Sequence, residues 1–150
     1  MYAKVAVGRG RWAKVDPDDV GLVSYCSCYM DDQGFARNSH NQRMHRVILG
    51  LLPGKPDVDH HNHDRLDNRR SNLRVATRSQ NNANQRKRTG TVSRFKGVWW
   101  IADRKKWGAQ ICVNGKHHRI GRFATEEEAA QAYNRAALAA WGEFALLNEV

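Results

Sequence analysis

Four side chains that could take part in hydrolysis lie within five residues of each other: Asp59, His60, His61 and His63. A histidine that is neutral near pH 7 can accept a proton from water, and a neighbouring carboxylate can bind a hard divalent cation. A single histidine is more often a surface or capping residue. A cluster that includes a carboxylate at the end of a strand is harder to dismiss and indicates a reactive site.

The elements around this cluster must position it. A short strand ends at Val58, a second strand covers 72–77, and the capping box TRSQ at 77–80 predicts a helix from Thr77 onward. A unit of about 30 residues buries little apolar surface by itself, so a metal or a neighbouring part of the chain must help to hold it.

Two asparagines extend the candidate site. Asn72 lies thirteen residues after Asp59, and Asn81 lies nine residues further on, in the first turn of the predicted helix. If the two strands pair and the helix packs across them, Asp59 and Asn81 converge on one ion. His60 then points into the same cleft.

The segment VDHHNHDRLDNRRSNLRVATRSQNNAN, residues 58–84, resembles the HNH endonuclease family in its His-Asn-Asn variety. With MHRVILG upstream, the resemblance covers about 44–84, and the combination of DHxN, DNRxxNLR and a Thr-capped Asn-rich helix is specific. It implies the ββα-metal fold, with His60 as the general base that deprotonates the attacking water. It also implies that Asp59 and Asn81 bind the metal and that Asn72 orients the loop that carries His60.

The same resemblance implies a divalent metal cofactor. Many relatives have His where this chain has Asn81, but an amide oxygen suits a hard ion, so Mg²⁺ is expected, with Mn²⁺ as an alternative. Asn82 is the ligand instead if the helix register differs by one residue, and roles for His61 and His63 stay open. Cleavage in this family leaves 5′-phosphate and 3′-hydroxyl ends.

Residues 94–150 follow the pattern of a small sheet packed on a helix. Strand-like segments cover 95–103, 106–114 and 117–123, and Asn114-Gly115 is a strong hairpin signal between the last two. A second capping box, TEEE at 125–128, predicts a helix whose mostly Ala stripe recurs at i, i+3, i+4 and i+7. This stripe lets the helix lie close to the sheet and is interpreted as core.

The segments FKGVWW, KKWGAQI, RIGRF and TEEEAAQAYNRAA make this region resemble an AP2 domain over residues 94–147. In that family a three-stranded antiparallel sheet, packed on one helix, binds the DNA major groove. The positions that match the family's DNA contacts are Trp99, Arg104, Trp107, Gln110, His117 and Arg119. We expect Trp99 and Trp107 to face DNA and Trp100 to pack under the helix. Several family arginines are replaced, so the base preference does not transfer.

Residues 1–50 show packing elements and no catalytic pattern. We expect a strand over 11–16, a helix start at Asp16-Pro17, a hairpin of 24–30 with 34–38, and a short helix within 44–52. Gly50 or Pro53-Gly54 would end this last helix. The block is expected to support the nuclease unit.

The positive charge is concentrated in one part of the chain. The 150 residues carry +10 at pH 7, and the segment 65–122 has 16 Lys or Arg against two acids, a net of +14. The other residues have nine bases against thirteen acids. A positive charge concentrated in one segment indicates binding to a polyanion more than a general contribution to solubility. We expect Arg86, Lys87 and Arg88 in the linker to follow the phosphate backbone, adding affinity without specificity.

Composition excludes several classes of protein. No apolar run approaches the roughly 20 residues that a membrane span needs, and the N-terminus lacks a signal peptide's apolar segment. Three cysteines fit neither a disulfide framework nor a Cys-based zinc finger. We therefore expect a cytoplasmic protein, located in the host cytosol if a phage encodes it.

The sequence thus predicts an α+β protein: a support and nuclease domain over 1–85 with its motif at 57–84, a basic linker over 86–93, and an AP2-like domain over 94–150. The predicted function is that of a metal-dependent endonuclease of double-stranded DNA, of the homing type found in phages and mobile elements. No obligate protein partner is expected. The alternatives are a non-cleaving sequence-specific DNA-binding protein with a structural HNH-like unit, and an RNA-binding or RNA-cleaving protein.

Overall fold

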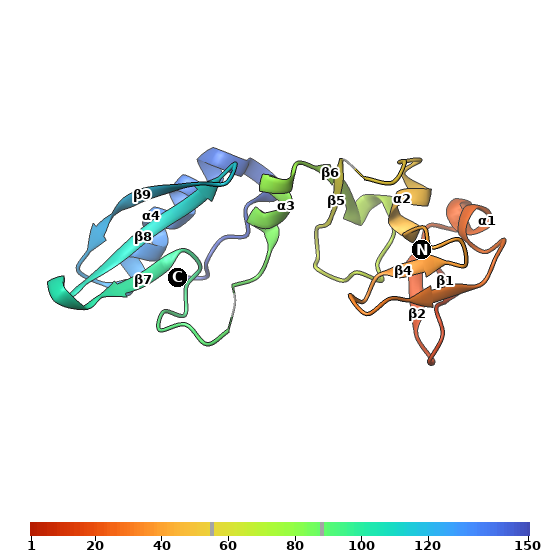
Figure 1. Cartoon of the computed structure of the whole chain (residues 1–150), viewed down its shortest axis with the longest axis horizontal. Coiled ribbons are helices and arrows are strands. Elements are labelled where there is room, and N and C mark those ends of the chain that lie inside the picture. The colour runs from red at the N-terminus through yellow and green to blue at the C-terminus, as the bar shows by residue number, and fades with distance from the viewer. Residues whose placement is uncertain (55, 88) are drawn as a thin grey trace. The chain divides into compact units, whose positions relative to one another are not determined.

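Two units make up the computed structural model, Met1–Thr77 and Arg78–Val150, and it describes residues 1–54, 56–87 and 89–150 (Figure 1). Both units combine short helices with antiparallel sheets, so the α+β class predicted from the sequence is confirmed. Among the described residues, no helix has both the length and the apolar character that crossing a bilayer requires. The domain boundaries predicted from the sequence stay predictions.

Over its described residues, 1–54 and 56–77, the first unit contains three two-stranded sheets. Its elements are β1 (Ala3–Ala6), β2 (Trp12–Val15), η1 (Pro17–Asp19), α1 (Val20–Val23), β3 (Cys28–Met30), β4 (Ala36–Asn38), α2 (Met44–Ile48), β5 (Asp57–His60), η2 (Arg70–Asn72) and β6 (Leu73–Ala76). Each strand pairs antiparallel with the next: β1 with β2, β3 with β4, and β5 with β6. The expected hairpin and the short apolar helix are confirmed.

Two details of the first unit differ from the sequence-based prediction. β5 does not end at Val58 but continues through His60, which pairs with Leu73 in β6. Asp16 precedes η1, but its carboxylate does not cap that helix: Oδ2 accepts a hydrogen bond from the backbone N of Arg70 at 2.8 Å. A partner far along the chain has thus replaced the local cap.

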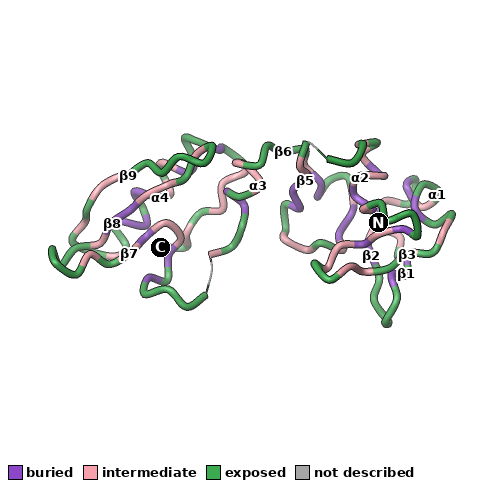
Figure 2. Tube along the Cα trace, viewed as in Figure 1, coloured by how far each residue is buried: buried purple, intermediate pink, exposed green. Residues whose placement is uncertain are grey.

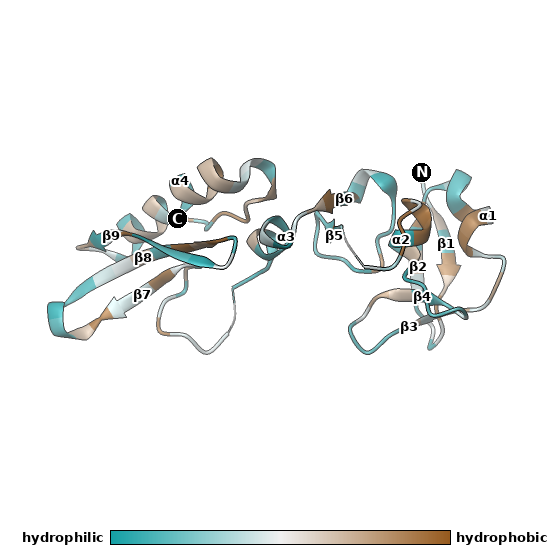
Figure 3. Ribbon diagram, turned by 45° about the horizontal axis from the view of Figure 1, so that its top comes forward, coloured by the Kyte–Doolittle hydropathy of each residue, from teal (hydrophilic) through white to brown (hydrophobic). Residues whose placement is uncertain are grey.

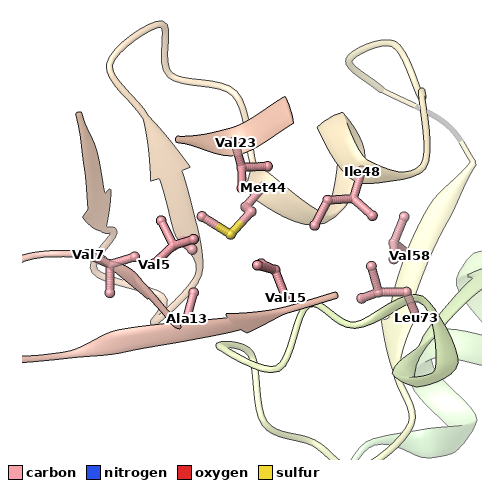
Figure 4. Close-up of a cluster of buried hydrophobic side chains, with 10 residues drawn as sticks. Val5, Val7, Ala13, Val15, Val23, Met44, Ile48, Val58 and Leu73 are labelled. Carbon is pink, nitrogen blue, oxygen red and sulfur yellow. The ribbon is translucent and has the colours of Figure 1, made fainter. Parts of the chain in front are cut away.

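One apolar cluster joins the N-terminal elements of this unit to the nuclease strands. The side chains from β1, β2, α1 and α2 meet those from β5 and β6, as Figure 4 shows. Its buried members include Val15, Met44, Ile48, Val58 and Leu73. The strands that carry the catalytic motif therefore fold on a core that residues 1–50 supply, in keeping with the expected support role.

The second unit contains α3 (Arg78–Asn84), β7 (Val98–Ile101), η3 (Ala102–Arg104), β8 (Lys106–Val113), β9 (Lys116–Phe123), α4 (Glu126–Trp141) and η4 (Gly142–Phe144). The three strands form one antiparallel sheet in the order β7-β8-β9, and α4 runs along one of its faces (Figure 1). The predicted three-stranded sheet on one helix is confirmed.

Local signals explain α4 well. Thr125 Oγ1 accepts from the backbone N of Glu128, and the Glu128 carboxylate accepts from the backbone N of Thr125, which is the complete capping box. The buried residues of the helix are Ala129, Ala130, Ala132, Tyr133, Ala137 and Trp141. The alanines allow close approach to the sheet, and the hydrophobic tint of α4 is visible in Figure 3.

Candidate nuclease site and DNA-binding face

His60, the last residue of β5, lies in a cluster of rings. Its ring centroid is 5.1 Å from that of His45 in α2 and 5.7 Å from that of Phe35, and those two rings meet edge to face at 5.4 Å. His60 Nε2 lies 3.4 Å from Asn68 Oδ1. His60 is only 6% exposed and His45 3%, and most of β5 is coloured as buried in Figure 2.

Burial sets the charge of both histidines. Removal from water disfavours a charged imidazole, and it lowers the pKa of His60 below its usual 6.5 and the pKa of His45 to about 3. Asn68 and the Asp59 carboxylate act on the pKa of His60 in the opposite direction. Both rings are therefore neutral at pH 7, the state in which an imidazole can accept a proton.

Two buried polar atoms on residues that contact His60, His45 Nδ1 and Asn68 Nδ2, have no hydrogen-bond partner within the described part of the chain, and neither has Arg43 Nε, which lies 4.0 Å from Asp31 Oδ2. His45 and Asn68 contact His60 directly, and the Arg43 guanidinium lies over the Phe35 ring at 4.4 Å. Buried polar atoms are nearly always paired. His45 Nδ1 and Asn68 Nδ2, on two residues that contact the same imidazole, mark a place where a bound molecule can complete the hydrogen bonding.

Asp59 lies opposite Arg74 in the β5–β6 ladder. The Arg74 guanidinium binds Asp59 Oδ2 through Nη2 and, at 3.2 Å, through Nε. Asp59 is 4% exposed, and a carboxylate at that depth needs a charged or hydrogen-bonding partner. Arg74 thus holds the carboxylate in a defined orientation beside His60.

Polar side chains organise the loop between β5 and β6. Asn72 Oδ1 accepts from the backbone N of Asn62 at 3.0 Å, and Asn72 Nδ2 donates to the carbonyl of Asp67 at 2.8 Å. The buried Asp67 carboxylate accepts from Asn62 Nδ2 at 2.9 Å and from Arg69 Nε at 2.8 Å. The bond from Arg69 is the main cause that holds the pKa of Asp67 below its usual value. Asn72 therefore has the contacts needed to orient the loop, and its role in cleavage stays a prediction.

The N-terminal block binds the same loop. The backbone of Lys14 in β2 donates to the Leu66 carbonyl at 2.7 Å and accepts from the backbone N of Asn68 at 2.8 Å. Arg70 makes a two-pronged ion pair with the buried Asp19, with Nη2–Oδ1 at 2.7 Å and Nε–Oδ2 at 2.9 Å. The conformation of the loop thus depends on residues about 50 positions away in the sequence.

The expected metal ligands are divided between the two units. Asp59 lies in the first, and Asn81 lies in α3 of the second, partly exposed, beside the exposed Asn82. Their convergence on one ion stays a prediction. A carboxylate and an amide oxygen suit a hard ion such as Mg²⁺, which keeps several waters and also binds phosphate oxygens. Within residues 1–54, 56–87 and 89–150, no three or more His, Cys, Asp or Glu side chains are grouped to hold a metal.

One face of the sheet in the second unit packs against α4. We call the opposite face the open face. The cross-strand register assigns to the open face Trp99, Gly108, Gln110, Cys112, His117, Arg119 and Arg122. A Cβ on Gly108 would come within 2.4 Å of the Trp99 indole, which shows that this ring lies across the glycine. Four of the six residues matched to DNA contacts therefore share one surface.

The environments of two tryptophans differ from those expected. Trp107 is partly buried and packs against the core cluster that contains Val98 and Ala109, on the α4 side of the sheet. Trp100 meets Trp107 edge to face, with ring centroids at 5.0 Å, but is 39% exposed, so it is not buried beneath the helix. A DNA contact by Trp107 stays a prediction.

The basic residues near the sheet are exposed or lie in connecting segments. Arg104 ends η3 at the β7–β8 turn, with its Nε 3.6 Å from the Asp103 carboxylate. In the linker, Arg86 is exposed and Lys87 is partly exposed, while Arg88 lies outside the described residues.

Three neighbours of His60 are absent from the set predicted by sequence: Phe35, His45 and Asn68. A histidine near the start of the mostly apolar run MHRVILG was a usable signal for His45, and Asn68 is part of the DNRxxNLR motif. Phe35 lies 25 residues before His60, directly before β4, and no local pattern connects it to the site.

Comparisons with known proteins match both regions. A family model described as HNH endonuclease matches residues 43–83, and one described as AP2 domain matches residues 93–143. An uncharacterized HNH endonuclease of Acanthamoeba polyphaga mimivirus is 36% identical over 150 residues, an alignment that covers 95% of this chain and 78% of the relative. No solved structure matches the chain.

Proposed function

The chain belongs to the HNH endonuclease family and carries an AP2 DNA-binding domain, and from this premise we propose that it is a metal-dependent endonuclease of double-stranded DNA. It hydrolyses phosphodiester bonds to 5′-phosphate and 3′-hydroxyl ends. We further propose that it acts as a homing endonuclease of a phage or another mobile element. The viral source of the relative is in keeping with that role.

The environment of His60 is the observation that carries the proposal. His60 is buried and neutral, and two buried polar atoms on residues that contact it, His45 Nδ1 and Asn68 Nδ2, have no hydrogen-bond partner among the described residues, which is uncommon for polar atoms in a core. Perturbed pKa values and unpaired polar atoms cluster at functional sites more than in scaffolds. This observation favours a nuclease over a DNA-binding protein with a purely structural HNH-like unit.

In the proposed reaction, His60 takes the proton from the attacking water. In the tautomer in which Nε2–H donates to Asn68 Oδ1, the basic lone pair lies on Nδ1, which is then the nitrogen that takes the proton. Such a base contributes typically 10²–10⁴-fold to the rate. Asn72 fixes the loop that begins at His61, whose backbone N donates to the Asn72 carbonyl at 3.0 Å, and so keeps the imidazole in position.

Asp59 and Asn81 are the proposed ligands of the divalent ion, Mg²⁺ in the first place and Mn²⁺ as the alternative. The ion, when bound, offsets the charge that develops on the phosphate and on the leaving 3′-oxygen. Arg74 orients the Asp59 carboxylate for this purpose. Carboxylates that bind a metal are commonly held in place by such hydrogen bonds.

The AP2 domain selects the DNA segment to be cut. Trp99, Gln110, His117 and Arg119 would contact the groove from the open face, with Arg104 at its edge. Trp107, on the α4 side of the sheet, would support that face from beneath. Arg86, Lys87 and Arg88 would bind phosphates along the linker. Phosphate contacts fix the register of the protein, and base contacts supply the specificity.

The test is cleavage of supercoiled plasmid with Mg²⁺ or Mn²⁺, with EDTA as the control, for the wild type, His60→Ala and His40→Ala. His40 is exposed and stacks on Tyr25 at a centroid distance of 6.3 Å, so its removal is a matched loss of one imidazole outside the site. We expect the wild type and His40→Ala to cut equally. His60→Ala should lose cleavage by at least about 100-fold and keep its affinity for DNA in EDTA.

Cleavage by His60→Ala at the wild-type rate would remove His60 from the mechanism. A wild type that binds DNA and cuts nothing with either ion would favour the non-cleaving DNA-binding protein. Cleavage of single-stranded RNA instead of plasmid, in a parallel assay, would overturn DNA as the substrate.

A further inference from the structure

The helix that carries Asn81 is fastened to the AP2 sheet and its helix, all within the second unit. Near its start, Ser79 Oγ accepts hydrogen bonds from Trp141 Nε1 at 3.1 Å and from the backbone N of Asn114 at 3.2 Å. Near its end, Ala83 is 3% exposed and packs in a cluster with Tyr133, Ala137 and Trp141. A helix of seven residues does not persist in water without such support.

Lys96 binds the other end of α3. Its Nζ donates to the carbonyls of Ala83 at 2.5 Å, Gln85 at 2.7 Å and Asn82 at 3.4 Å. The last carbonyls of a helix have no partner within the helix and carry the negative end of its dipole. A single ammonium group meets both needs here, so that Lys96 acts as a C-terminal cap supplied by the AP2 domain.

Lys96 is itself held rigidly. Its backbone N donates to Asn148 Oδ1 at 2.7 Å, and its carbonyl accepts from Asn148 Nδ2 at 3.1 Å. The backbone of Asn148 in turn exchanges two hydrogen bonds with the Asn134 side chain on α4, at 2.8 and 2.9 Å. A continuous set of contacts therefore runs from α4 through Asn148 and Lys96 to the carbonyls of α3.

The environment of the ammonium supports a dedicated role. Burial lowers the pKa of Lys96 to about 8, because a charged amine loses its hydration in that position. An exposed lysine on a DNA-binding surface does not incur this cost. Three carbonyl acceptors at the end of one helix compensate for the lost water.

We propose that Lys96 is a positioning residue for cleavage, which holds α3 so that Asn81 has a fixed place relative to the DNA-binding sheet. The inference rests on the proposed function, in which Asn81 is a metal ligand. It adds that the domain which binds DNA also holds one of the metal ligands. The AP2 domain is then required for the activity of the metal site as well as for finding the target.

The test is a comparison of Lys96→Met, Lys96→Arg and Lys4→Ala with the wild type. Methionine keeps the aliphatic stem of Lys96 and removes its three donors, arginine keeps a cation that can donate to carbonyls, and Lys4 is an exposed lysine on β1. For each protein we would measure plasmid cleavage over a range of Mg²⁺ concentrations, and DNA affinity in EDTA.

We expect Lys96→Met to need about 10-fold more Mg²⁺ or to cut about 10-fold more slowly, the size of effect typical of residues that support metal ligands. Its DNA affinity in EDTA should stay within about twofold of wild type, a factor that corresponds to a small change in binding free energy. Lys96→Arg should recover most of the activity, and Lys4→Ala should behave as the wild type.

Ser79→Ala provides a second route to the same conclusion if Lys96→Met fails to fold. It removes the acceptor for Trp141 Nε1 and for the Asn114 backbone at the other end of α3, and should raise the Mg²⁺ requirement in the same way. The inference is overturned if Lys96→Met and Ser79→Ala cut with wild-type metal dependence. It is also overturned if Lys96→Met loses DNA affinity in EDTA as much as it loses cleavage. A wild type that does not cut overturns the proposed function and this inference together.

Discussion

On β5 and in the loop that follows it, the side chains assigned to catalysis are buried and hydrogen-bonded. On the open face of β7–β9, the side chains assigned to DNA binding are exposed or half-buried. Asn72 is 6% exposed and bonds to two separate points of its loop. His117 and Arg119 are exposed on β9, whose pairing with β8 shifts register beside Arg119. In the first region, the position of a functional side chain depends on its hydrogen bonds to polar neighbours. In the second region, it depends on the backbone of the sheet.

This difference follows from what each surface must do. A general base and a metal ligand need a fixed geometry and a controlled protonation state, which burial and hydrogen bonds provide. A DNA-binding face needs accessible side chains and gains its precision from the backbone that supports them. Substitutions should therefore affect catalysis in the first region, and should affect the second region most when they disturb the packing under the sheet.

The largest effect is expected on the free energy of unfolding, for a substitution in the packing between the sheet and α4. Gly97 has φ +74°, and a Cβ there would lie 2.2 Å from Tyr133 Cδ2 and 2.7 Å from the Gln110 carbonyl oxygen. Gly97→Ala combines backbone strain with overpacking and should lower the free energy of unfolding by about 3 kcal/mol. Thermal or urea unfolding measures this change.

Gly115→Ala is the matched control, because its φ is +80° and no atom lies within 4 Å of the added Cβ. It should lower the free energy of unfolding by about 1 kcal/mol through backbone strain alone. Equal losses for the two variants would mean that packing under the sheet contributes little, and the contrast between the two regions would fail.

The next largest effect is expected on the rate of cleavage, for a substitution in the loop between β5 and β6. Asn72→Ala removes the bonds to Asn62 and Asp67 and should slow cleavage by about 100-fold, because a small displacement of a catalytic group has a cost of that order. DNA affinity in EDTA should not change. Ser71→Ala, an exposed neighbour, should cut normally. If Asn72→Ala cuts as fast as Ser71→Ala, the hydrogen bonds of the loop do not position the site.

The smallest effect concerns the protonation of the buried histidines. The pKa of His45 is about 3 in the folded protein and 6.5 as an ordinary side chain, so the unfolded state takes up its proton first as the pH falls. The stability from this group is complete above about pH 6.5 and is lost toward pH 3. Acidification from pH 7 to pH 5 should lower the free energy of unfolding by about 2 kcal/mol through His45.

His45→Leu replaces the imidazole with an apolar side chain that fills the buried position and has no group that takes up a proton. Thermal unfolding of the metal-free protein at pH 7 and pH 5 should therefore show a loss for the wild type that is about 2 kcal/mol larger than that for the variant. Equal losses would mean that His45 is not held neutral by burial, and that the ring cluster around His60 is open to water.

Local patterns were sufficient for most of the elements. The capping box at Thr125, the Asn114-Gly115 turn and the strand-like segment 106–114 each act through neighbours a few positions away, and the structure contains all three elements. β1 was not predicted, because a four-residue strand near the terminus has no strong local signal. The role of residues 1–50 as a support was predicted in outline, but the Arg70–Asp19 ion pair was not.

The sequence alone determined which chemical groups are available and in what order they occur: Asp59 and His60 at a strand end, Asn72 before the next strand, Asn81 on a short helix, and a basic sheet beyond. The tertiary structure decided that Phe35 and His45 enclose His60, that Arg74 holds Asp59, and that Lys96 binds the end of α3. The physical reason is that capping and turn preferences are local, whereas burial, the pKa values it sets and hydrogen bonds across 13 or more positions arise only when distant segments pack together.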